Sequence, residues 1–364
     1  MIRIALLGAG WASRTIWLPL LCDSQSCEVV AVADPDGSAR HAVTSSYPKI
    51  PVVETMEDVL KARPDLVLIA TPNCFHVPQA EALLRAGVSV LIEKPACFTM
   101  EEAQNLVKLA QAHGAGLWVS SASKERQDVT KMRNITASGD IGPIRCVDVS
   151  WIRRAGIPRA GSWFTRNTDA IGGVGGDLGW HMLDVALSFT DFSMIQTGIS
   201  LLACDPPSKS ECDAAWLGGQ TADKPSTGDL IVDVETQAFA AFKTDHGSLL
   251  RLSVAWDSHE VEDKTCVTIN GRDGCLKLET TFGFSTSSTS SPRLTLLKKG
   301  KAEDIALTDT PKIQPYQTYL QQVLQEFGQS TPQSYQSLFS VVSGIEKLYT
   351  PDIGIQTFST PKFS

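Results

Sequence analysis

Short apolar runs alternate with segments of helical length along the first 120 residues of the chain. Runs of strand length lie at residues 2–7, 29–33, 66–70, 88–92 and 117–120. Segments with helical spacing lie between them, at residues 12–21, 39–44, 56–61, 77–86 and 100–113. Almost wholly apolar strands that alternate with helices are typical of a parallel sheet with helices on its faces. The pattern therefore predicts an α/β domain at residues 1–121 with an open, doubly wound parallel sheet.

The pattern changes after residue 121. Helical stretches at residues 124–138 and 175–189 lead into strand-like runs that are separated by turn residues. These strands are expected at residues 144–151, 195–204, 230–243, 248–256, 265–270, 275–279 and 293–298. Helical spacing returns at residues 315–327 and 333–349, and polar stretches at 205–229 and 285–292 are expected to be loops. Residues 122–364 are therefore predicted to form a second, α+β domain with an open, mostly antiparallel sheet.

Composition and charge narrow the class of protein. With 43% hydrophobic and 20% charged residues, the 364-residue chain is typical of a globular protein of two or three domains. A net charge of −8 disfavours nucleic acid as a partner. No apolar run is long enough to span a bilayer, and the first residues lack the layout of a signal peptide, so no membrane partner is expected. Nine cysteines without a C-x-x-C pair predict reduced thiols, no metal site and a cytoplasmic location.

A glycine motif follows the first predicted strand. Gly8 and Gly10 stand directly after it, and Trp11, Ala12 and Ser13 open the helix. In a G-x-G-x-x-G motif the first two glycines allow a tight turn and a close approach to a pyrophosphate at the helix N-terminus. Ser13 replaces the third glycine and is small enough for helix and sheet to pack. The motif predicts dinucleotide binding; the alternative is a tight turn without a ligand.

Asp34 ends the second predicted strand, about twenty residues beyond the glycine motif, which is the spacing expected for a carboxylate that binds the adenosine ribose. A carboxylate there would repel a 2′-phosphate, so NAD is favoured over NADP. Arg40 is the nearby cation that would weaken this preference. The alternative is that Asp34 only caps a turn.

Polar residues also follow the strands that end at residues 70 and 92, at the edge where an open α/β sheet binds its ligands. After the first come Thr71, Pro72, Asn73 and His76, and after the second come Glu93, Lys94 and Pro95. A lysine at this edge can hydrogen-bond a substrate oxygen. The alternative is an ordinary solvated lysine.

Asp177 and His181 form the second candidate set. At i and i+4 of a helix they would share one face, and a carboxylate beside an imidazole orients the ring and raises its basicity, as a general base requires. The preceding glycines, Gly172 to Gly176, would let the backbone approach a ligand. The alternatives are a helix N-cap for Asp177 and a core histidine for His181.

Arginines surround an aromatic segment just before this set. Arg153, Arg154, Arg159 and Arg166 flank Trp163. The arginines could bind a phosphate or carboxylate and Trp163 the face of a sugar ring. The alternative is a group of solvated arginines.

Taken together, these motifs resemble the Gfo/Idh/MocA family of NAD(P)-dependent oxidoreductases, named after glucose–fructose oxidoreductase and inositol dehydrogenase. The Glu93-Lys94-Pro95 and Asp177-x-x-x-His181 motifs carry most of the resemblance, which spans nearly the whole chain. It implies that Lys94, Asp177 and His181 contact the reacting hydroxyl, with His181 as acid/base. It also implies a Rossmann domain and a second domain whose open sheet often joins subunits into dimers or tetramers.

We therefore expect an NAD-dependent dehydrogenase that moves a hydride between nicotinamide and a ring hydroxyl or ketone. The expected substrate is a sugar, an aminosugar such as an aminoglycoside, a nucleotide sugar or a cyclitol. The expected cofactor-binding residues are Gly8, Gly10, Trp11, Ala12, Asp34, Thr71, Pro72, Asn73, His76, Glu93 and Lys94. The expected substrate-binding residues are Lys94, Arg153, Trp163, Asp177 and His181. The alternatives are a nicotinamide-sensing regulator without catalysis, and a reductase of another carbonyl such as a pyrrole pigment or a dihydrodiol.

Overall fold

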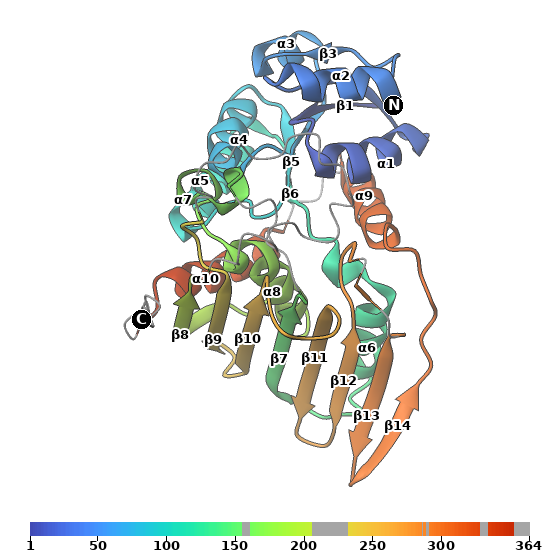
Figure 1. Cartoon of the computed structure of the whole chain (residues 1–364), viewed down its shortest axis with the longest axis vertical. Coiled ribbons are helices and arrows are strands. Elements are labelled where there is room, and N and C mark those ends of the chain that lie inside the picture. The colour runs from blue at the N-terminus through green and yellow to red at the C-terminus, as the bar shows by residue number, and fades with distance from the viewer. Residues whose placement is uncertain (155–160, 206–231, 286, 289–290, 328–333, 353–364) are drawn as a thin grey trace. The chain divides into compact units, whose positions relative to one another are not determined.

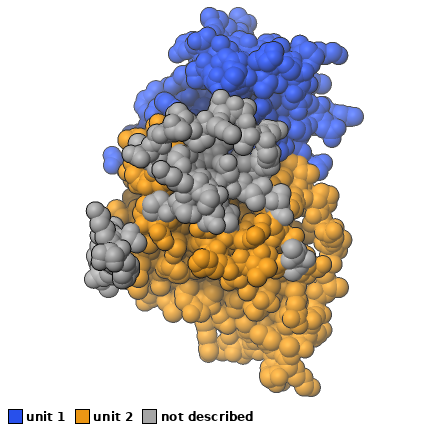
Figure 2. Space-filling model, in the orientation of Figure 1, with its two compact units in different colours: residues 1–97, 101–122, 316–335 blue, residues 98–100, 123–315, 336–364 orange. Residues whose placement is uncertain are grey.

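The computed structural model describes residues 1–154, 161–205, 232–285, 287–288, 291–327 and 334–352. The chain divides into two compact units, which have different colours in Figure 2. Unit 1 consists of Met1–Cys97, Glu101–Ala122 and Tyr316–Tyr335, and unit 2 of Phe98–Met100, Ser123–Pro315 and Gln336–Ser364. The predicted domain boundary after residue 121 stays a prediction. The segment Tyr316–Tyr335 belongs to unit 1 by its contacts, although it comes late in the chain.

Unit 1 contains a parallel sheet of six strands in the order β3-β2-β1-β4-β5-β6, which is the order of a doubly wound dinucleotide-binding sheet (Figure 1). Its strands are β1 Ile2–Leu7, β2 Cys27–Ala33, β3 Val52–Val53, β4 Leu66–Ile69, β5 Ser89–Ile92 and β6 Leu117–Val119. Every residue of β4 and β5 is buried, which explains why these strands are apolar without alternation. The predicted α/β fold is confirmed.

Helices connect these strands. They are α1 Leu18–Asp23, α2 Gly37–Ser46, α3 Met56–Lys61, α4 His76–Arg85 and α5 Met100–His113, and α9 Gln314–Glu326 joins them from far along the chain. A π-helical turn, Ser13–Trp17, precedes α1, where the sequence predicted one regular helix. Helix α2 starts where Asp36 accepts a hydrogen bond from the Ser38 N–H, and α3 where Thr55 accepts one from Asp58.

Unit 2 contains a sheet of eight described strands in the order β14-β13-β12-β11-β7-β10-β9-β8 (Figure 1). The strands are β7 Ile144–Ile152, β8 Ile195–Ala203, β9 Gln237–Thr244, β10 Leu249–Ala255, β11 Lys264–Gly271, β12 Cys275–Thr280, β13 Arg293–Lys298 and β14 Lys301–Ile305. The helices are α6 Gln127–Ala137, α7 Asn167–Ala170, α8 Trp180–Leu187 and α10 Gln336–Tyr349. The mostly antiparallel sheet is confirmed, and the β7–β10 pair is the parallel exception.

Helices α8 and α10 pack on one face of this sheet. Alternate residues of the strands, such as Leu250, Leu252 and Val254 of β10, are buried on that face. Asp245, His246 and Gly247 close the β9–β10 hairpin, and Gly247 has a φ of 85°. Residues 206–231, which include the start of the expected 230–243 strand and most of the 205–229 loop, lie outside the described residues, as do 353–364.

No helix within the described ranges is both long and apolar enough to cross a bilayer. The same ranges contain no cluster of three or more His, Cys, Asp and Glu side chains with the geometry of a metal site.

Candidate active site

The glycine loop after β1 is packed tightly against its own sheet. Gly8 has a φ of +91°, and a Cβ on it would lie 2.4 Å from the carbonyl oxygen of Ala70. The Ser13 hydroxyl donates a hydrogen bond of 2.6 Å to the Gly8 carbonyl, so the residue that replaces the third glycine holds the turn closed. A Cβ on Gly10 would meet no heavy atom within 4 Å. The loop therefore leaves room at Gly10 for a diphosphate to approach the backbone, in front of the helix that Trp11 and Ala12 begin.

The Asp34 carboxylate lies at the end of β2, beside this loop. One of its oxygens accepts a hydrogen bond of 2.7 Å from the Ala9 N–H and the other accepts one of 2.8 Å from the Asp36 N–H. Each oxygen has a further lone pair for a ribose hydroxyl. The Arg40 guanidinium donates to the backbone carbonyls of Asp34 and Pro35. Both the turn-capping role and the ribose-binding role expected for Asp34 fit this geometry.

His76 joins two loops of unit 1. Its Nδ1 lies 2.8 Å from the Pro95 carbonyl oxygen and its Nε2 lies 2.8 Å from the Thr71 carbonyl oxygen, and its side chain is only 1% exposed. Burial lowers the pKa of His76, although both backbone contacts raise it. Thr71 also donates from its hydroxyl to Gln79, and Pro72 precedes a short turn that begins at Asn73. The ring of His76 therefore links the loop after β4 to the loop after β5.

Glu93 follows β5 and is held in place by Trp17. The Trp17 indole N–H donates a hydrogen bond of 2.7 Å to one carboxylate oxygen, and the Lys94 backbone N–H donates one of 3.1 Å to the other. Desolvation raises the pKa of Glu93, and the charge of Lys94 and the Trp17 hydrogen bond oppose that rise. The Lys94–Pro95 peptide bond is cis. Trp17 comes from the π-helical turn, so the first helix also shapes the Lys94 loop.

In unit 2, Asp177 lies in a second π-helical turn, Gly175–Gly179, which leads into α8. Its side chain is 7% exposed, and one carboxylate oxygen accepts a hydrogen bond of 2.9 Å from the Trp256 indole N–H. The same oxygen lies 3.7 Å from a guanidinium nitrogen of Arg153. Asp177 is thus a buried carboxylate that faces a cation, as a charge inside a protein requires.

His181, at 9% exposure, lies one turn further along. Its Nδ1 lies 2.9 Å from the Ser123 hydroxyl, and its ring packs against the indole of Trp151 with centroids 5.7 Å apart. The π-helical turn changes the spacing from that of a regular α-helix, so the orienting role expected of Asp177 stays a prediction. Ser123 and Trp151 were missed because nothing in the sequence links positions so distant from His181.

The glycines before Asp177 allow other segments of unit 2 to pack closely against this backbone. A Cβ on Gly173 would lie 2.1 Å from the Glu235 carbonyl oxygen, and one on Gly172 would lie 2.3 Å from the Tyr349 hydroxyl. A Cβ on Gly175 would lie 2.7 Å from Leu348. The expected close approach of this backbone is therefore made by residues of unit 2, where the sequence interpretation had placed a ligand.

The arginine-flanked segment is partly described. Trp163 packs on Phe164 with ring centroids 4.7 Å apart, and Phe164 packs on Trp256, so an aromatic row leads from Trp163 to the indole that binds Asp177. Arg153 is 7% exposed and burial lowers its pKa, with the charge of Asp177 opposing this effect. Arg166 pairs with Asp169 on the surface, and Arg159 lies outside the described residues.

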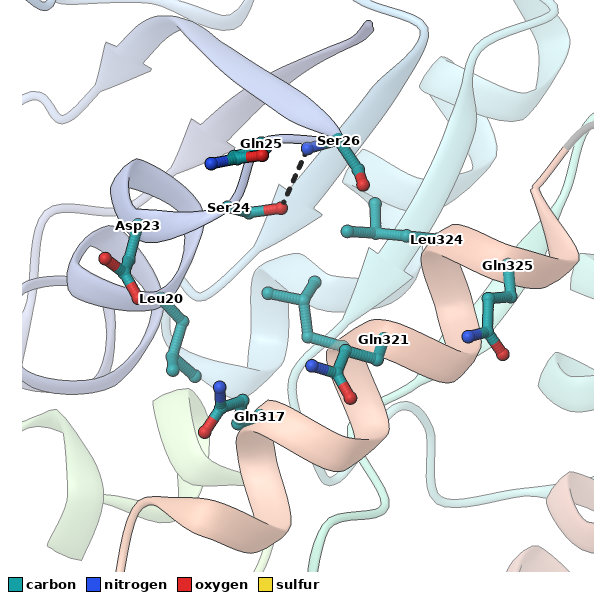
Figure 3. Close-up of a pocket in the computed structure, with 10 residues that line it drawn as sticks. Leu20, Asp23, Ser24, Gln25, Ser26, Gln317, Gln321, Leu324 and Gln325 are labelled. Atoms are coloured by element: carbon teal, nitrogen blue, oxygen red, sulfur yellow. Dashed lines mark hydrogen bonds between the residues drawn. The ribbon is translucent and has the colours of Figure 1, made fainter.

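Two grooves lie away from all of these residues. In unit 1, a groove of about 320 Å³ runs between the end of α1 and helix α9, and it is lined by Gln317, Gln321 and Gln325 of α9 and by Asp23 and the residues that follow it (Figure 3). In unit 2, a wider groove of about 800 Å³ follows the sheet face opposite α8 and α10. None of the expected cofactor-binding or substrate-binding residues lines either groove.

The sequence-predicted residues thus fall into two sets. Those for the cofactor gather where β1, β2, β4 and β5 end in unit 1, with Lys94 among them. Asp177, His181 and Arg153 gather in unit 2, and Trp163 connects to them through aromatic rings. The first set has the loop and carboxylate of a dinucleotide-binding sheet, and the second has a buried carboxylate and an oriented imidazole.

These features define an oxidoreductase with an NAD-binding Rossmann fold, and comparison with known proteins gives the family. Residues 2–121 match the model described as "Oxidoreductase family, NAD-binding Rossmann fold", and residues 129–277 match the GFO/IDH/MocA C-terminal domain. The chain belongs to the Gfo/Idh/MocA family of oxidoreductases, which bind NAD or NADP, as the sequence predicted.

Two of the relatives are named for sugar compounds. The chain is 35% identical over 299 residues to a protein of Amycolatopsis mediterranei assigned as the oxidoreductase subunit of UDP-kanosamine synthase, covering 82% of this chain and 81% of that protein. It is 30% identical over 197 residues to D-glucoside 3-dehydrogenase of Escherichia coli, covering 54% and 56% of the two chains. Its fold matches that of KijD10, a 3-ketoreductase of Actinomadura kijaniata solved with NADP and TDP-benzene, with a TM-score of 0.78 at 18% identity and 99% coverage of both chains.

Proposed function

We propose that this chain is an NAD-dependent dehydrogenase that oxidises the hydroxyl on ring carbon 3 of a glucose-type sugar, in the first instance one carried on a nucleoside diphosphate. The observation that carries the proposal is the buried pair of Asp177, which faces Arg153, and His181, which is oriented by Ser123. The position on the ring is supported by the relative named D-glucoside 3-dehydrogenase, and the nucleotide by the relative named for UDP-kanosamine.

In the proposed reaction the hydroxyl loses a proton and its carbon loses a hydride, which leaves a ketone. NAD supplies the acceptor for the hydride when it is bound. His181 takes the proton on Nε2, in the tautomer in which Nδ1 carries the proton toward the Ser123 hydroxyl, 2.9 Å away, and Nε2 keeps its lone pair. Lys94 donates a hydrogen bond to the same substrate oxygen and stabilises the charge that develops on it. Asp177 accepts a hydrogen bond from the sugar and helps to orient His181.

The cofactor is proposed to lie along the loop and strand ends of unit 1. Gly8 keeps the turn tight, Gly10 leaves space for the diphosphate, and Asp34 binds the ribose hydroxyls. The Arg40 guanidinium donates hydrogen bonds to two backbone carbonyls and forms an ion pair with Glu54 at 3.5 Å. Because its charge is already paired in this way, Arg40 supports the preference for NAD over NADP. Trp11, Ala12, Asn73 and the loops joined by His76 complete the proposed cofactor contacts.

The sugar is proposed to lie against the aromatic row of unit 2. Trp163 offers a ring face for stacking, and Arg153 acts on the substrate through Asp177, whose charge it balances. A phosphate-binding role fits Arg153 poorly because its guanidinium is buried beside that carboxylate.

We also propose that the chain forms homodimers or homotetramers through the open face of the unit 2 sheet. Ile199, Leu201, Phe239 and Leu249 are each about half exposed on that face, at 49%, 50%, 48% and 51%. Apolar side chains gathered in this way are typical of a protein interface. The net charge of −8 argues against a nucleic-acid partner. The cysteine content supports a cytoplasmic location.

The proposal is tested by NADH absorbance when the purified protein and NAD are offered UDP-glucose, dTDP-glucose, a methyl glucoside, glucose 6-phosphate, myo-inositol and an aminoglycoside. NADH should form with a nucleotide sugar, and Lys94→Ala and His181→Ala should abolish it. Lys108→Ala, which changes an exposed lysine of the same unit as Lys94, serves as the control. Absence of NADH with all six, despite NAD binding, would contradict the proposal and favour a regulator that only senses nicotinamide.

A further inference from the structure

The polypeptide that leads into the Asp177 turn is tied to two other parts of unit 2. One carboxylate oxygen of Glu235 accepts hydrogen bonds of 2.9 Å from the N–H groups of both Gly173 and Gly175. The Tyr349 hydroxyl donates a hydrogen bond of 2.7 Å to the same oxygen, and it accepts one of 2.9 Å from the Gly176 N–H. Two side chains thus bind three backbone amides just before Asp177.

These three amides lie at the start of a helix, where the first N–H groups have no carbonyl partner one turn earlier. They therefore need hydrogen-bond acceptors from outside the helix. A carboxylate at this end also interacts favourably with the helix dipole. The contact is reinforced by the backbone, since the Val174 N–H donates to the Glu235 carbonyl at 3.0 Å. The turn that carries Asp177 is therefore fixed at its start.

The two anchoring residues come from different elements. Glu235 lies two residues before β9, and Tyr349 is the last residue of α10. The glycines are what permit the contact, because a Cβ on Gly175 would lie 2.9 Å from the Tyr349 hydroxyl and 3.1 Å from the Glu235 carboxylate. Desolvation raises the pKa of both side chains, so Tyr349 keeps the proton that it donates.

We propose that Glu235 and Tyr349 are positioning residues, which hold the Gly175–Gly179 turn so that Asp177 and His181 keep the orientation that catalysis needs. This inference rests on the proposed function of Asp177 and His181. The anchor touches neither of the two reacting groups, and it acts on them through one turn of backbone. A shift of about 1 Å in a catalytic group can cost about 100-fold in rate, so a loosened anchor should slow the chemical step.

The test compares Tyr349→Phe, which removes the hydroxyl, with Glu235→Ala and with Glu235→Gln, which keeps an oxygen acceptor. Ser343→Ala is the matched control, because it removes a different hydrogen bond of α10, the one of 3.0 Å from the Ile195 N–H. Hydrogen exchange of the Gly173, Gly175 and Gly176 amides and the ring ¹³C resonances of His181 in histidine-labelled protein are measured in each variant. Neither measurement requires a substrate.

We expect exchange at the three amides to rise by about tenfold or more in Tyr349→Phe and Glu235→Ala, and the His181 resonance to move. Glu235→Gln and Ser343→Ala should stay close to the wild type. With a substrate that yields NADH, kcat should fall by about 10- to 100-fold in the first two variants while KM for NAD stays within about twofold.

Faster exchange without a change in the His181 resonance would overturn the inference, because the anchor would then be structural only. An equal shift in Ser343→Ala would overturn it as well. If the wild type oxidises none of the sugars, the proposed function fails on its own, and the exchange and resonance measurements still decide whether Glu235 and Tyr349 orient His181.

Discussion

The Ser123 hydroxyl lies 2.9 Å from Nδ1 of His181, although the two residues are 58 positions apart in the chain. A hydrogen bond between this ring nitrogen and the hydroxyl restricts the orientation of the imidazole. Ser123→Ala should lower kcat by about tenfold, because the imidazole is no longer held in its orientation, and should leave the Kd for NAD unchanged. Steady-state kinetics measure the first and a fluorescence titration the second. Ser138→Ala, at an exposed position of unit 2, is the control, and equal rates in both variants would exclude this role.

Gly8 and Gly10 should respond differently to the same substitution. Gly8→Ala places a Cβ 2.4 Å from the Ala70 carbonyl at a φ of +91°, so the free energy of unfolding should fall by about 2 kcal/mol or more. Gly10→Ala meets no atom of the chain, so its stability should match the wild type while the Kd for NAD rises by about tenfold. Thermal unfolding and calorimetric NAD titration separate the two effects. Normal NAD binding by Gly10→Ala would place the diphosphate elsewhere.

Asp34 should control the choice between NAD and NADP. Asp34→Ala removes the carboxylate that is proposed to bind two ribose hydroxyls, each worth about 1 kcal/mol, so the Kd for NAD should rise by about 10- to 100-fold and the preference over NADP should shrink. Asp36→Ala is a close control, since it removes only the N-cap of α2 and should cost about 1 kcal/mol of stability. An unchanged ratio of the two Kd values in Asp34→Ala would leave Asp34 as a turn cap alone.

The buried ring of His76 should make stability depend on pH. Because burial lowers its pKa below the ordinary value of about 6.5, the unfolded chain binds a proton more readily than the folded chain does. Stability is therefore complete above about pH 6.5 and is lost as the pH falls below that value. His76→Gln should flatten this part of the profile in urea unfolding, whereas His113→Gln, at an exposed site, should not. Identical profiles for wild type and His76→Gln would contradict this explanation.

Most of unit 1 could be predicted from the sequence because its strands are buried and apolar and because α2 and α3 begin at side-chain caps. Three features of the two sheets, one in unit 1 and two in unit 2, were not predicted. Val52 and Val53 form a strand too short to have a period of its own, defined only by pairing with Val32 and Ala33. Strand β14 was missed because Lys301–Ile305 is polar and mostly exposed at an edge of the sheet. Parallel pairing of β7 with β10 depends on contacts between distant segments, which local patterns do not contain.

The candidate site could be predicted in part for the same reason. Glycine spacing and strand ends pointed to Gly8, Gly10, Asp34 and Lys94, since these signals are local. The partners of Asp177 and His181 are not local: Trp256 is 79 positions from Asp177, and Ser123 is 58 positions from His181. Neither π-helical turn has a sequence signal comparable to a cap, so the sequence predicted regular helices in both places.

The central claim is that hydride leaves ring carbon 3 of a nucleotide sugar for NAD. Its most direct test is incubation of the protein with NAD and UDP-glucose that carries deuterium at carbon 3, followed by mass spectrometry of the nicotinamide cofactor. We predict deuterated NADH with the wild type and with Lys108→Ala, and none with Lys94→Ala or His181→Ala. NADH that forms without deuterium would place the reaction at another carbon, and no NADH from a protein that binds NAD would contradict the proposed activity.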